Sequence, residues 1–532
     1  MTHLAFPRWR ALALSILLLL LSLPGRAADL QESVNLLNGS FADKSTAVQG
    51  LLDSGHEQTG QWLQALLDGG LYTDKNSGQV VVQTDASAAQ VQELASGRQY
   101  ETAKSDLKRI TINNALRKDI RMALSSLALT SRDSEARLAA VRALMGSLEP
   151  ALRERLADLQ LKETDADVRD AMTVALAIDE VRNSSKPERH SIEVLGDSLE
   201  PEARNALQQL HDRDPASASG KLAAKALASI ESKVLWSGYI ETLFFGLSLG
   251  SVLVLAAIGL AITFGVMGII NMAHGELIML GAYTTYVIQL LMPNHIGLSV
   301  LVAIPAAFVV SGLMGILIER SVIRFLYGRP LETLLATFGI SLILQQLVRT
   351  IFSPLNRSVE TPDWMTGSLA LSPVLSLTWN RIYILLFCLI VFALLFVLLK
   401  RTRLGLQVRA VSQNRAMARA MGVRSARVDA LTFGLGSGIA GVAGVALSQL
   451  TNVGPNLGQA YIIDSFMVVV FGGVGNLWGT LVAGLSLGVA NKVLEPVAGA
   501  VLAKILVLVF IILFIQKFPR GLFPQKGRSA EG

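Results

Sequence analysis

The chain changes its preferred solvent partway along its length, and this change limits what it can fold into. Residues 29–232 are polar, whereas the stretch from about Trp236 to Phe518 consists of long apolar runs with few charges. Residues 1–232 hold 31 Asp and Glu against 26 Lys and Arg, and residues 233–532 hold 10 against 21, so the net charge of +6 divides into −5 and +11. We therefore expect a water-soluble domain joined to a domain that lies in a lipid bilayer.

The N-terminus has the pattern of a secretory signal peptide. Two arginines precede an apolar run at residues 11–23, and small residues follow that run. At ~1.5 Å per residue the run is too short to cross a hydrocarbon core of ~30 Å comfortably. The sequence predicts a signal peptide over residues 1–28, with an uncleaved anchor helix as the alternative. Either segment would leave residues 29–232 outside the cytoplasm.

The exported domain, residues 29–232, is predicted to be mainly α-helical. One interruption, residues 71–82, has a turn-rich centre between apolar ends and is typical of a β-hairpin. A weak repeat with a period of 32 residues matches Asp133, Arg137, Ala139, Ala143 and Leu144 to Asp165, Arg169, Ala171, Ala175 and Leu176, with a looser third copy near Arg204 and Ala206. An N-capping Asp followed by small and apolar residues at helical spacing suits stacked helix pairs. The alternative is an irregular helical domain.

Residues 233–522 are predicted to form an all-α polytopic membrane domain with about 8–9 transmembrane segments. Glycine interrupts several of the apolar runs, so we expect some segments to be discontinuous. Residues 400–428 carry eight basic side chains and no acidic one, which places this segment in the cytoplasm by the positive-inside rule. The basic tail, residues 523–532, belongs on the same side.

The segment GVMGIINMAHGELIMLGAY, residues 265–283, places polar side chains between two apolar runs. Ionisable groups at membrane depth usually face a cavity or a protein partner. The candidates for lining a transport pathway are Asn271, His274, Glu276, Asp464 and Asn476. The alternative for the first three is a cytoplasmic helix turn at which Glu276 caps a helix. His274 and Glu276 are only two residues apart and have no second ligand pair, so no metal site is predicted.

The same segment and a second one, VVVFGGVGNLWGTLVAGLSLG at residues 468–488, are rich in glycine. Small residues allow helices to approach one another closely in a membrane. The predicted helix-packing glycines are Gly265, Gly268, Gly275, Gly472, Gly473, Gly475 and Gly479. For the second segment packing is the favoured role, and lining of a pathway is the alternative.

No motif of the sequence predicts catalysis on this chain. The phosphate-binding pattern G-x-x-x-x-G-K-[ST] is absent, so the chain is not expected to hydrolyse ATP by such a loop. The single cysteine, Cys388, excludes an internal disulfide and a cysteine-based metal cluster. We expect a transport subunit rather than an enzyme, with no catalytic residues and no cofactor bound to this chain.

Together with RAMARAMGV at residues 415–423, these two glycine-rich segments resemble the corresponding segments of ABC-importer permeases of the branched-chain amino-acid type. The resemblance covers roughly residues 236–522. The usual permease of that family lacks a large exported domain, and a permease that has one resembles the first permease subunit of urea importers. The resemblance implies a second related permease subunit, two cytoplasmic ATPase subunits that bind the ATP, and a periplasmic solute-binding protein, without any nucleic acid.

The resemblance also identifies the basic segment 400–428 with the coupling loop on which the ATPases of importers dock. The residues predicted to belong to this coupling loop are Arg409, Arg415, Ala416, Ala418, Arg419 and Gly422, and Gly422 fits the glycine of the family's loop. This chain has Ala416-Met417-Ala418 where the family has Glu-Ala-Ala, so the docking is implied but the contact made by the Glu is not. From charge alone, the alternative is an orientation signal that touches lipid headgroups.

The leading functional hypothesis is a permease subunit of an ABC importer. It would form half of the transmembrane path for a small polar solute, with urea foremost, by ATP-driven alternating access. The alternatives are a passive channel for urea or a similar solute and a permease for branched-chain amino acids. The expected location is the bacterial inner membrane, with the N-terminal domain in the periplasm and the C-terminus in the cytoplasm.

Overall fold

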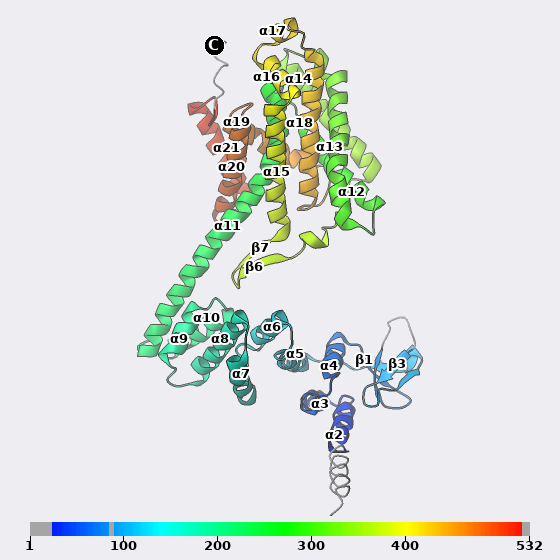
Figure 1. Cartoon of the computed structure of the whole chain (residues 1–532), viewed down its shortest axis with the longest axis vertical. Helices are drawn as coiled ribbons and strands as arrows, with labels where there is room; N and C mark the ends of the chain where they lie inside the picture. The colour runs from blue at the N-terminus through cyan, green and yellow to red at the C-terminus, as the bar shows by residue number, and fades with distance from the viewer. Residues whose placement is uncertain (1–23, 84–89, 524–532) are drawn as a thin grey trace, which may run out of the picture. The chain divides into compact units, whose positions relative to one another are not determined.

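The structure is a computed structural model that describes residues 24–83 and 90–523 of the chain (Figure 1). Most of the predicted signal peptide, residues 1–28, lies outside the described residues, and so does the predicted tail, residues 523–532, apart from Phe523.

The chain divides into two compact units, Met1–Lys233 and Val234–Gly532, which we call the N-terminal unit and the membrane unit. The division falls inside one continuous helix, α11 (Ala218–Met267). Ala223 and Leu227 of this helix belong to a core of the N-terminal unit, and Val252 belongs to the core of the membrane unit. Each unit therefore has a hydrophobic core of its own.

The first part of the N-terminal unit combines helices with a small sheet. The helices are α2 (Pro24–Leu36), α3 (Phe41–Ser54) and α4 (Thr59–Asp68), and α5 (Asn114–Ala128) closes this part. Ser40 and Asp43 form a capping box at the start of α3, which typically stabilises a helix by ~1 kcal/mol. Leu51, Leu63 and Ile120 are fully buried in the shared core.

The sheet has five antiparallel strands in the order β4-β3-β2-β1-β5. The strands are β1 (Leu71–Asp74), β2 (Val80–Gln83), β3 (Gln90–Glu93), β4 (Gln99–Glu101) and β5 (Leu107–Arg109), with a short 3₁₀ turn, η1 (Lys104–Asp106), before the last. β1 and β2 form the predicted hairpin, with Tyr72 opposite Val81. The expectation of helix beyond the hairpin is wrong for β3 to β5. These strands are three or four residues long and mostly polar, so no alternation marks them in the sequence.

The second part of the N-terminal unit is helical: α6 (Ser134–Leu144), α7 (Pro150–Lys162), α8 (Ala166–Asn183), α9 (Arg189–Asp197) and α10 (Pro201–Arg213). α8 packs against α6, α7, α9 and α10, and Met172 and Ile178 of α8 are fully buried among them. This arrangement buries a continuous core between successive helices, as stacked helix pairs do.

The two clear copies of the predicted repeat have the same local structure. Asp133 and Asp165 are the N-caps of α6 and α8, and each accepts a hydrogen bond from the backbone two residues later. Arg137 and Arg169 each donate to the carbonyl oxygens five and six residues earlier. The third copy differs from the other two: its helix, α10, begins without a hydrogen bond from a capping side chain.

Within residues 24–83 and 90–523, seven helices are long and apolar enough to cross a membrane. They are α11, α13 (Ile296–Ser321, extended by the 3₁₀ turn η2, Ile323–Phe325), α14 (Pro330–Phe352), α15 (Trp379–Arg401), α18 (Ser425–Ser448), α20 (Leu477–Ala498) and α21 (Ala500–Lys517). Two further helices complete the unit, α12 (His274–Leu291), which begins with polar residues, and α19 (Leu457–Gly472), which is 16 residues long. The predicted all-α polytopic fold is confirmed.

α11 and α18 are the central helices of the membrane unit. Their most apolar windows are 83% and 89% buried, against 22% for α15 and 17% for α21, whose apolar side chains are left for lipid. α18 packs against α12 and α13. A Cβ on Gly281 of α12 would lie 2.0 Å from the carbonyl oxygen of Gly441 of α18, so these two backbones touch.

The two ends of the membrane unit carry different structures. At one end a connection contains the 3₁₀ turn η3 (Asp363–Met365) and the hairpin β6 (Ser368–Ser372) and β7 (Leu375–Thr378). At the other end α16 (Arg403–Gln413) and α17 (Arg415–Ala420) form the basic segment, and α15 runs between the two ends (Figure 1).

Candidate functional site

The first predicted motif forms the junction between α11 and α12. Gly268 follows α11 with φ +67°, a left-handed conformation that glycine adopts without steric cost. The Oδ1 of Asn271 accepts a hydrogen bond from the N–H of Ala273 at 3.0 Å, and the Oγ1 of Thr337 accepts one from the N–H of Met272 at 3.1 Å. The helix is therefore interrupted between α11 and α12, and a hydrogen bond to Thr337 fixes the connecting backbone to α14.

Three predicted pathway residues are buried beside this junction. Asn271, His274 and Glu276 are 0, 0 and 1% exposed. The Nε2 of His274 lies 2.8 Å from a backbone carbonyl oxygen of α11, so this nitrogen carries the proton and donates it. The Oε1 of Glu276 accepts hydrogen bonds from Ser341 Oγ at 2.9 Å and Gln345 Nε2 at 2.7 Å, both on α14. These side chains face α11 and α14 rather than lipid.

Each of the three side chains keeps one polar atom unpaired. The Nδ2 of Asn271, the Nδ1 of His274 and the Oε2 of Glu276 have no hydrogen-bond partner among the described residues. An unpaired buried polar atom costs ~1–3 kcal/mol, so such atoms are uncommon and call for an explanation. The amide nitrogen is a donor, and the imidazole nitrogen and the carboxylate oxygen are acceptors.

A polar row on α14, which the motif analysis missed, faces this cluster. Thr333, Thr337, Ser341 and Gln345 follow one another at intervals of four residues and are at most 4% exposed. Residues four apart lie on one face of a helix, so this row forms a polar stripe on an otherwise apolar span. The period of four in the sequence is the signal that predicts it.

The other two pathway candidates lie on different elements. Asp464 of α19 forms an ion pair with Lys504 of α21 at 3.2 Å. Asn476 is the N-cap of α20, where its Oδ1 accepts from the N–H of Gly479 at 3.2 Å, and its Nδ2 donates to the carbonyl oxygen of Phe523 at 3.2 Å. These contacts account for Asn476 without a solute.

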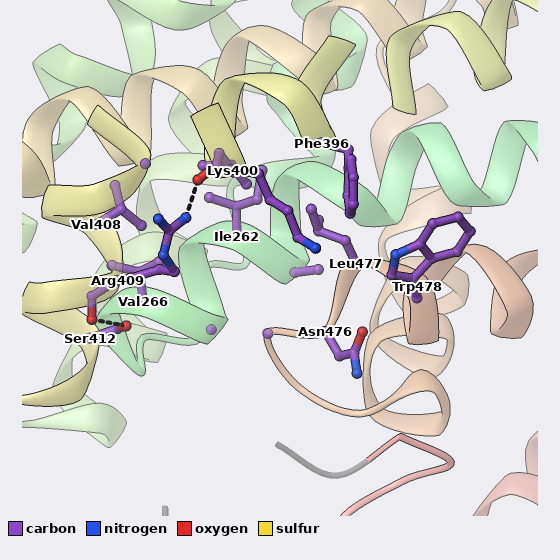
Figure 2. Close-up of a pocket in the computed structure, with 15 residues that line it drawn as sticks. Ile262, Val266, Phe396, Lys400, Val408, Arg409, Ser412, Asn476, Leu477 and Trp478 are labelled. Atoms are coloured by element: carbon purple, nitrogen blue, oxygen red, sulfur yellow. Dashed lines mark hydrogen bonds between the residues drawn. The ribbon is translucent and has the colours of Figure 1, made fainter. Parts of the chain in front are cut away.

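The three sequence motifs meet in one pocket at the end of the membrane unit that carries α16. The pocket has a volume of about 320 Å³ and is lined by Gly265 of the first motif, Arg409 of the basic segment, and Gly475 and Asn476 of the second glycine-rich segment. Figure 2 shows the side chain of Lys400 reaching into the space between Arg409 and Trp478. Arg409 is held by a hydrogen bond to the carbonyl oxygen of Leu399. The pocket thus joins α16 to the end of α11 and the start of α20.

Several predicted packing glycines stand at close backbone contacts. A Cβ on Gly265 would lie 2.4 Å from the Cα of Gly475, and one on Gly275 would lie 2.5 Å from the carbonyl oxygen of Gly458. Real Cβ atoms do not approach other atoms so closely, so any larger residue would push these elements apart.

The remaining packing glycines divide into two kinds. Gly472 and Gly479 face each other, and a Cβ on Gly473 would lie 2.8 Å from the carbonyl oxygen of Phe523. Gly268 differs from the expectation, because a Cβ there would meet nothing within 4 Å. Its requirement is the positive φ that ends α11.

Two arginines of the basic segment, Arg415 and Arg419, bind within the chain. Arg415 donates to both carboxylate oxygens of Asp429 on α18, at 2.8 and 3.0 Å, and Arg419 Nε donates to Ser425 Oγ at 2.7 Å. Ala418 of α17 is 5% exposed and belongs to a small apolar cluster with residues of α16 and α18. Gly422, with φ +87°, follows α17 and turns the chain toward α18. These residues therefore fix the position of α17.

A second acid lies close to this ion pair. Glu319 is 1% exposed and accepts a hydrogen bond from the hydroxyl of Tyr327 at 3.3 Å. The guanidinium of Arg415 lies over the ring of Tyr327, 4.9 Å from its centroid. Burial, together with the carboxylates of Asp429 and Glu319, raises the pKa of the Tyr327 phenol, so it stays protonated and donates.

The exposed surface of the basic segment is apolar in part. Leu406, Met417 and Met421 are 62, 61 and 78% exposed, and Ala416 is exposed beside them. Exposed apolar side chains on a rigidly held helix are typical of a docking surface for another protein. The sequence analysis concentrated on the charges of this segment and missed its methionines.

The fold and this site define a class: a multi-pass membrane permease with a helical segment presented at one end. The chain belongs to the family described as the permease component of branched-chain amino acid transport systems, whose profile matches residues 242–515. The homologues are transport permease subunits.

The chain is similar to several curated permeases. It is 30% identical over 293 residues to the high-affinity branched-chain amino acid transport system permease BraD of Pseudomonas aeruginosa, covering 53% of this chain and 95% of that one. It is 29% identical over 300 residues to LivH of Escherichia coli, with the same two shares, and 26% identical over 284 residues to the ribose import permease RbsC of Escherichia coli, covering 52% and 84%. No solved structure matches the chain significantly.

Proposed function

We propose that the chain forms half of the transmembrane path of an ABC importer for a small polar solute and is driven by ATPase subunits that dock on α16 and α17. The observation that carries this proposal is the convergence of the three motifs at one pocket, beside helices whose exposed surface is apolar in part. ATP would bind to the partner subunits, and a second related permease would complete the path.

The geometry supports a mechanical link from the docking surface to the solute path. Arg415 and Asp429 tie α17 to α18, and α18 packs against α12, which carries Glu276. A displacement of α17 on ATP binding would therefore reach the polar cluster through packed helices. This is the kind of coupling that alternating access requires.

The docking surface can be tested by replacing its methionines. Each methionine buried at an interface contributes ~1.5–3 kcal/mol, so Met417→Glu with Met421→Glu should weaken ATPase binding by about a hundredfold or more. Gln413→Glu adds a negative charge to the same exposed segment without removing an apolar contact, and serves as the control. Co-purification of the ATPases and solute-stimulated ATP hydrolysis are the measurements. Wild-type hydrolysis in the double variant would contradict the proposal.

For the solute we propose urea. BraD and LivH match over 95% of their own length but only 53% of this chain, so almost half of this chain has no counterpart in them. The proposal rests on this added portion, because a permease with an exported N-terminal domain resembles the first permease subunit of urea importers. The names of BraD and LivH favour a branched-chain amino acid instead, which is the second candidate.

Uptake into proteoliposomes separates these candidates. Vesicles would contain both permeases, the ATPases and the solute-binding protein, and labelled urea and labelled leucine would be compared with and without ATP. ATP-dependent uptake of urea but not leucine is the expected result. Uptake of leucine alone would identify the amino-acid permease, and ATP-independent uptake of urea would identify a passive channel.

We further propose that residues 29–232 lie in the periplasm and contact the solute-binding protein. The support is their net acidic composition and the stacked helices α6 to α10, which present an extended surface. A role in assembly alone is the alternative. Expression of residues 29–232 tests independent folding. No association of this domain with the solute-binding protein, together with normal uptake by a permease that lacks the domain, would leave only the role in assembly.

A further inference from the structure

A second polar cavity lies in the membrane unit, at the end opposite to α16 and α17. It has a volume of about 270 Å³ and is lined by residues of α11, α15, α19, α20 and α21. Arg381 is in the first turn of α15, Lys504 follows the first turn of α21, and Lys492 is near the end of α20. Neither the coupling segment nor the Glu276 cluster contributes to it.

Of the three basic side chains that line this cavity, two form ion pairs with carboxylates and one does not. Lys492 pairs with Glu495 at 2.5 Å, and Lys504 pairs with Asp464 at 3.2 Å. Arg381 has no ion pair or hydrogen bond among the described residues and lies over the ring of Phe245, 4.7 Å from its centroid. Arginine presents five donors in a planar fork that matches a phosphate or a carboxylate. The cavity therefore suits an anion of single charge.

Two helix N-termini add to this preference. Arg381 belongs to the first turn of α15, and Ala500 and Ala503 of the lining belong to the first turn of α21. Both helices are long, and the backbone N–H groups of a first turn, with the helix dipole, favour a negative charge.

Buried polar atoms with no partner line the same cavity. Ser248 is 0% exposed and Asn491 is 8% exposed, and the Oγ of Ser248 and the Oδ1 of Asn491 have no hydrogen-bond partner in residues 24–83 and 90–523. An amide oxygen accepts hydrogen bonds, so the ligand must carry a donor besides its anionic oxygens. Leaving such atoms unpaired is costly, which argues that the cavity is built for a ligand.

We propose that this cavity binds the headgroup of a phospholipid, through an anionic phosphodiester held by Arg381 and a headgroup hydroxyl or ammonium held by Asn491 and Ser248. The lipid source is favoured because the helix that borders the cavity is apolar outside it: Val501, Leu502 and Ile505 of α21 are 76, 48 and 49% exposed, and acyl chains can lie along them. A soluble anion that carries a donor has the same chemistry, and the experiment separates the two.

The test uses the full chain, purified in a neutral detergent and stripped of lipid. Phosphatidylglycerol, dioleoylglycerol without a phosphate, and inorganic phosphate are the three probes, and binding is followed by native mass spectrometry and thermal stability. Arg381→Gln should lower the affinity for phosphatidylglycerol at least tenfold. Arg324→Gln is the matched control, since Arg324 also lies over a phenyl ring but is exposed and away from the cavity, and its effect should stay within twofold.

The outcomes are distinct. Equal binding of phosphatidylglycerol and dioleoylglycerol, or equal effects of the two arginine variants, would overturn the proposal. Binding of inorganic phosphate with the same dependence on Arg381, but no preference for phosphatidylglycerol over dioleoylglycerol, would assign the site to a soluble anion and overturn the lipid source.

Two further variants test the proposal independently if Arg381→Gln does not fold. Ser248→Ala and Asn491→Ala each remove an unpaired atom, so the lipid-free protein should keep or gain thermal stability while its affinity for phosphatidylglycerol falls. Lower stability of the lipid-free protein with unchanged affinity would mean that these groups serve the fold alone, and the proposal would fail.

Discussion

The ion pair between Arg415 and Asp429 should respond unequally to loss of its two members. Asp429 is 1% exposed, whereas the side chain of Arg415 is 31% exposed. Arg415→Ala strands a buried carboxylate. Asp429→Asn leaves an arginine that can turn toward water. We therefore expect the arginine variant to cost far more stability than the asparagine variant.

The magnitude follows from the geometry. Two charges ~4 Å apart at an effective dielectric of ~20 attract by ~4 kcal/mol, and removing one member of a buried pair costs ~3–5 kcal/mol. Because Arg415 is about one-third exposed, solvent screens part of this, and we take ~3 kcal/mol for Arg415→Ala. For Asp429→Asn we expect ~1 kcal/mol, the net value of an ordinary hydrogen bond. The double variant Arg415→Ala with Asp429→Asn should cost less than Arg415→Ala alone, because no charge is stranded.

The single cysteine provides the assay. Cys388 is 1% exposed in the core of the membrane unit, so a thiol reagent reaches it only when the unit opens. The labelling rate over a series of denaturant concentrations gives the free energy of unfolding, and a loss of ~3 kcal/mol corresponds to about a hundredfold faster labelling. Equal losses for the two single variants, or a double variant whose cost is the sum of both, would refute the reasoning.

Two further predictions concern the backbone contacts and pH. Gly275→Ala should lower the thermal stability of the membrane unit more than Gly268→Ala, because its Cβ would meet the carbonyl oxygen of Gly458 at 2.5 Å, whereas the other substitution meets only backbone strain of ~1 kcal/mol; the reverse order in detergent melting curves would contradict this. In the N-terminal unit, hydrogen bonds from Arg137 hold the pKa of Glu163 below its ordinary value of 4.5. This contribution to stability is complete above that value and is lost as the pH falls through the lower pKa of the folded state. The domain of residues 29–232 should therefore melt at a lower temperature below pH 4.5. Arg137→Ala should make its melting temperature depend less on pH in that range.

The sequence determined the features that depend on local pattern. The change from polar to apolar segments predicted a membrane unit preceded by a polar N-terminal unit. The positive charge of residues 400–428 indicated the segment that forms α16 and α17. The repeat of Asp and Arg predicted the caps of α6 and α8, because a cap is made by residues within a few positions of one another. The strands β3 to β5 escaped prediction, because their stability comes from neighbours in the sheet rather than from their own short polar sequences.

Only the tertiary structure decided which of the marked residues meet. Glu276 lies 65 and 69 residues before Ser341 and Gln345, and no local rule brings them together. In the basic segment the sequence indicated Arg415 and Arg419 as residues of the coupling loop. In the folded chain both also bind within the chain, and the exposed surface beside them includes Met417 and Met421. The physical reason is that a charge near a bilayer can be satisfied by water, lipid or a buried carboxylate, and the choice depends on what the folded chain places within hydrogen-bonding distance.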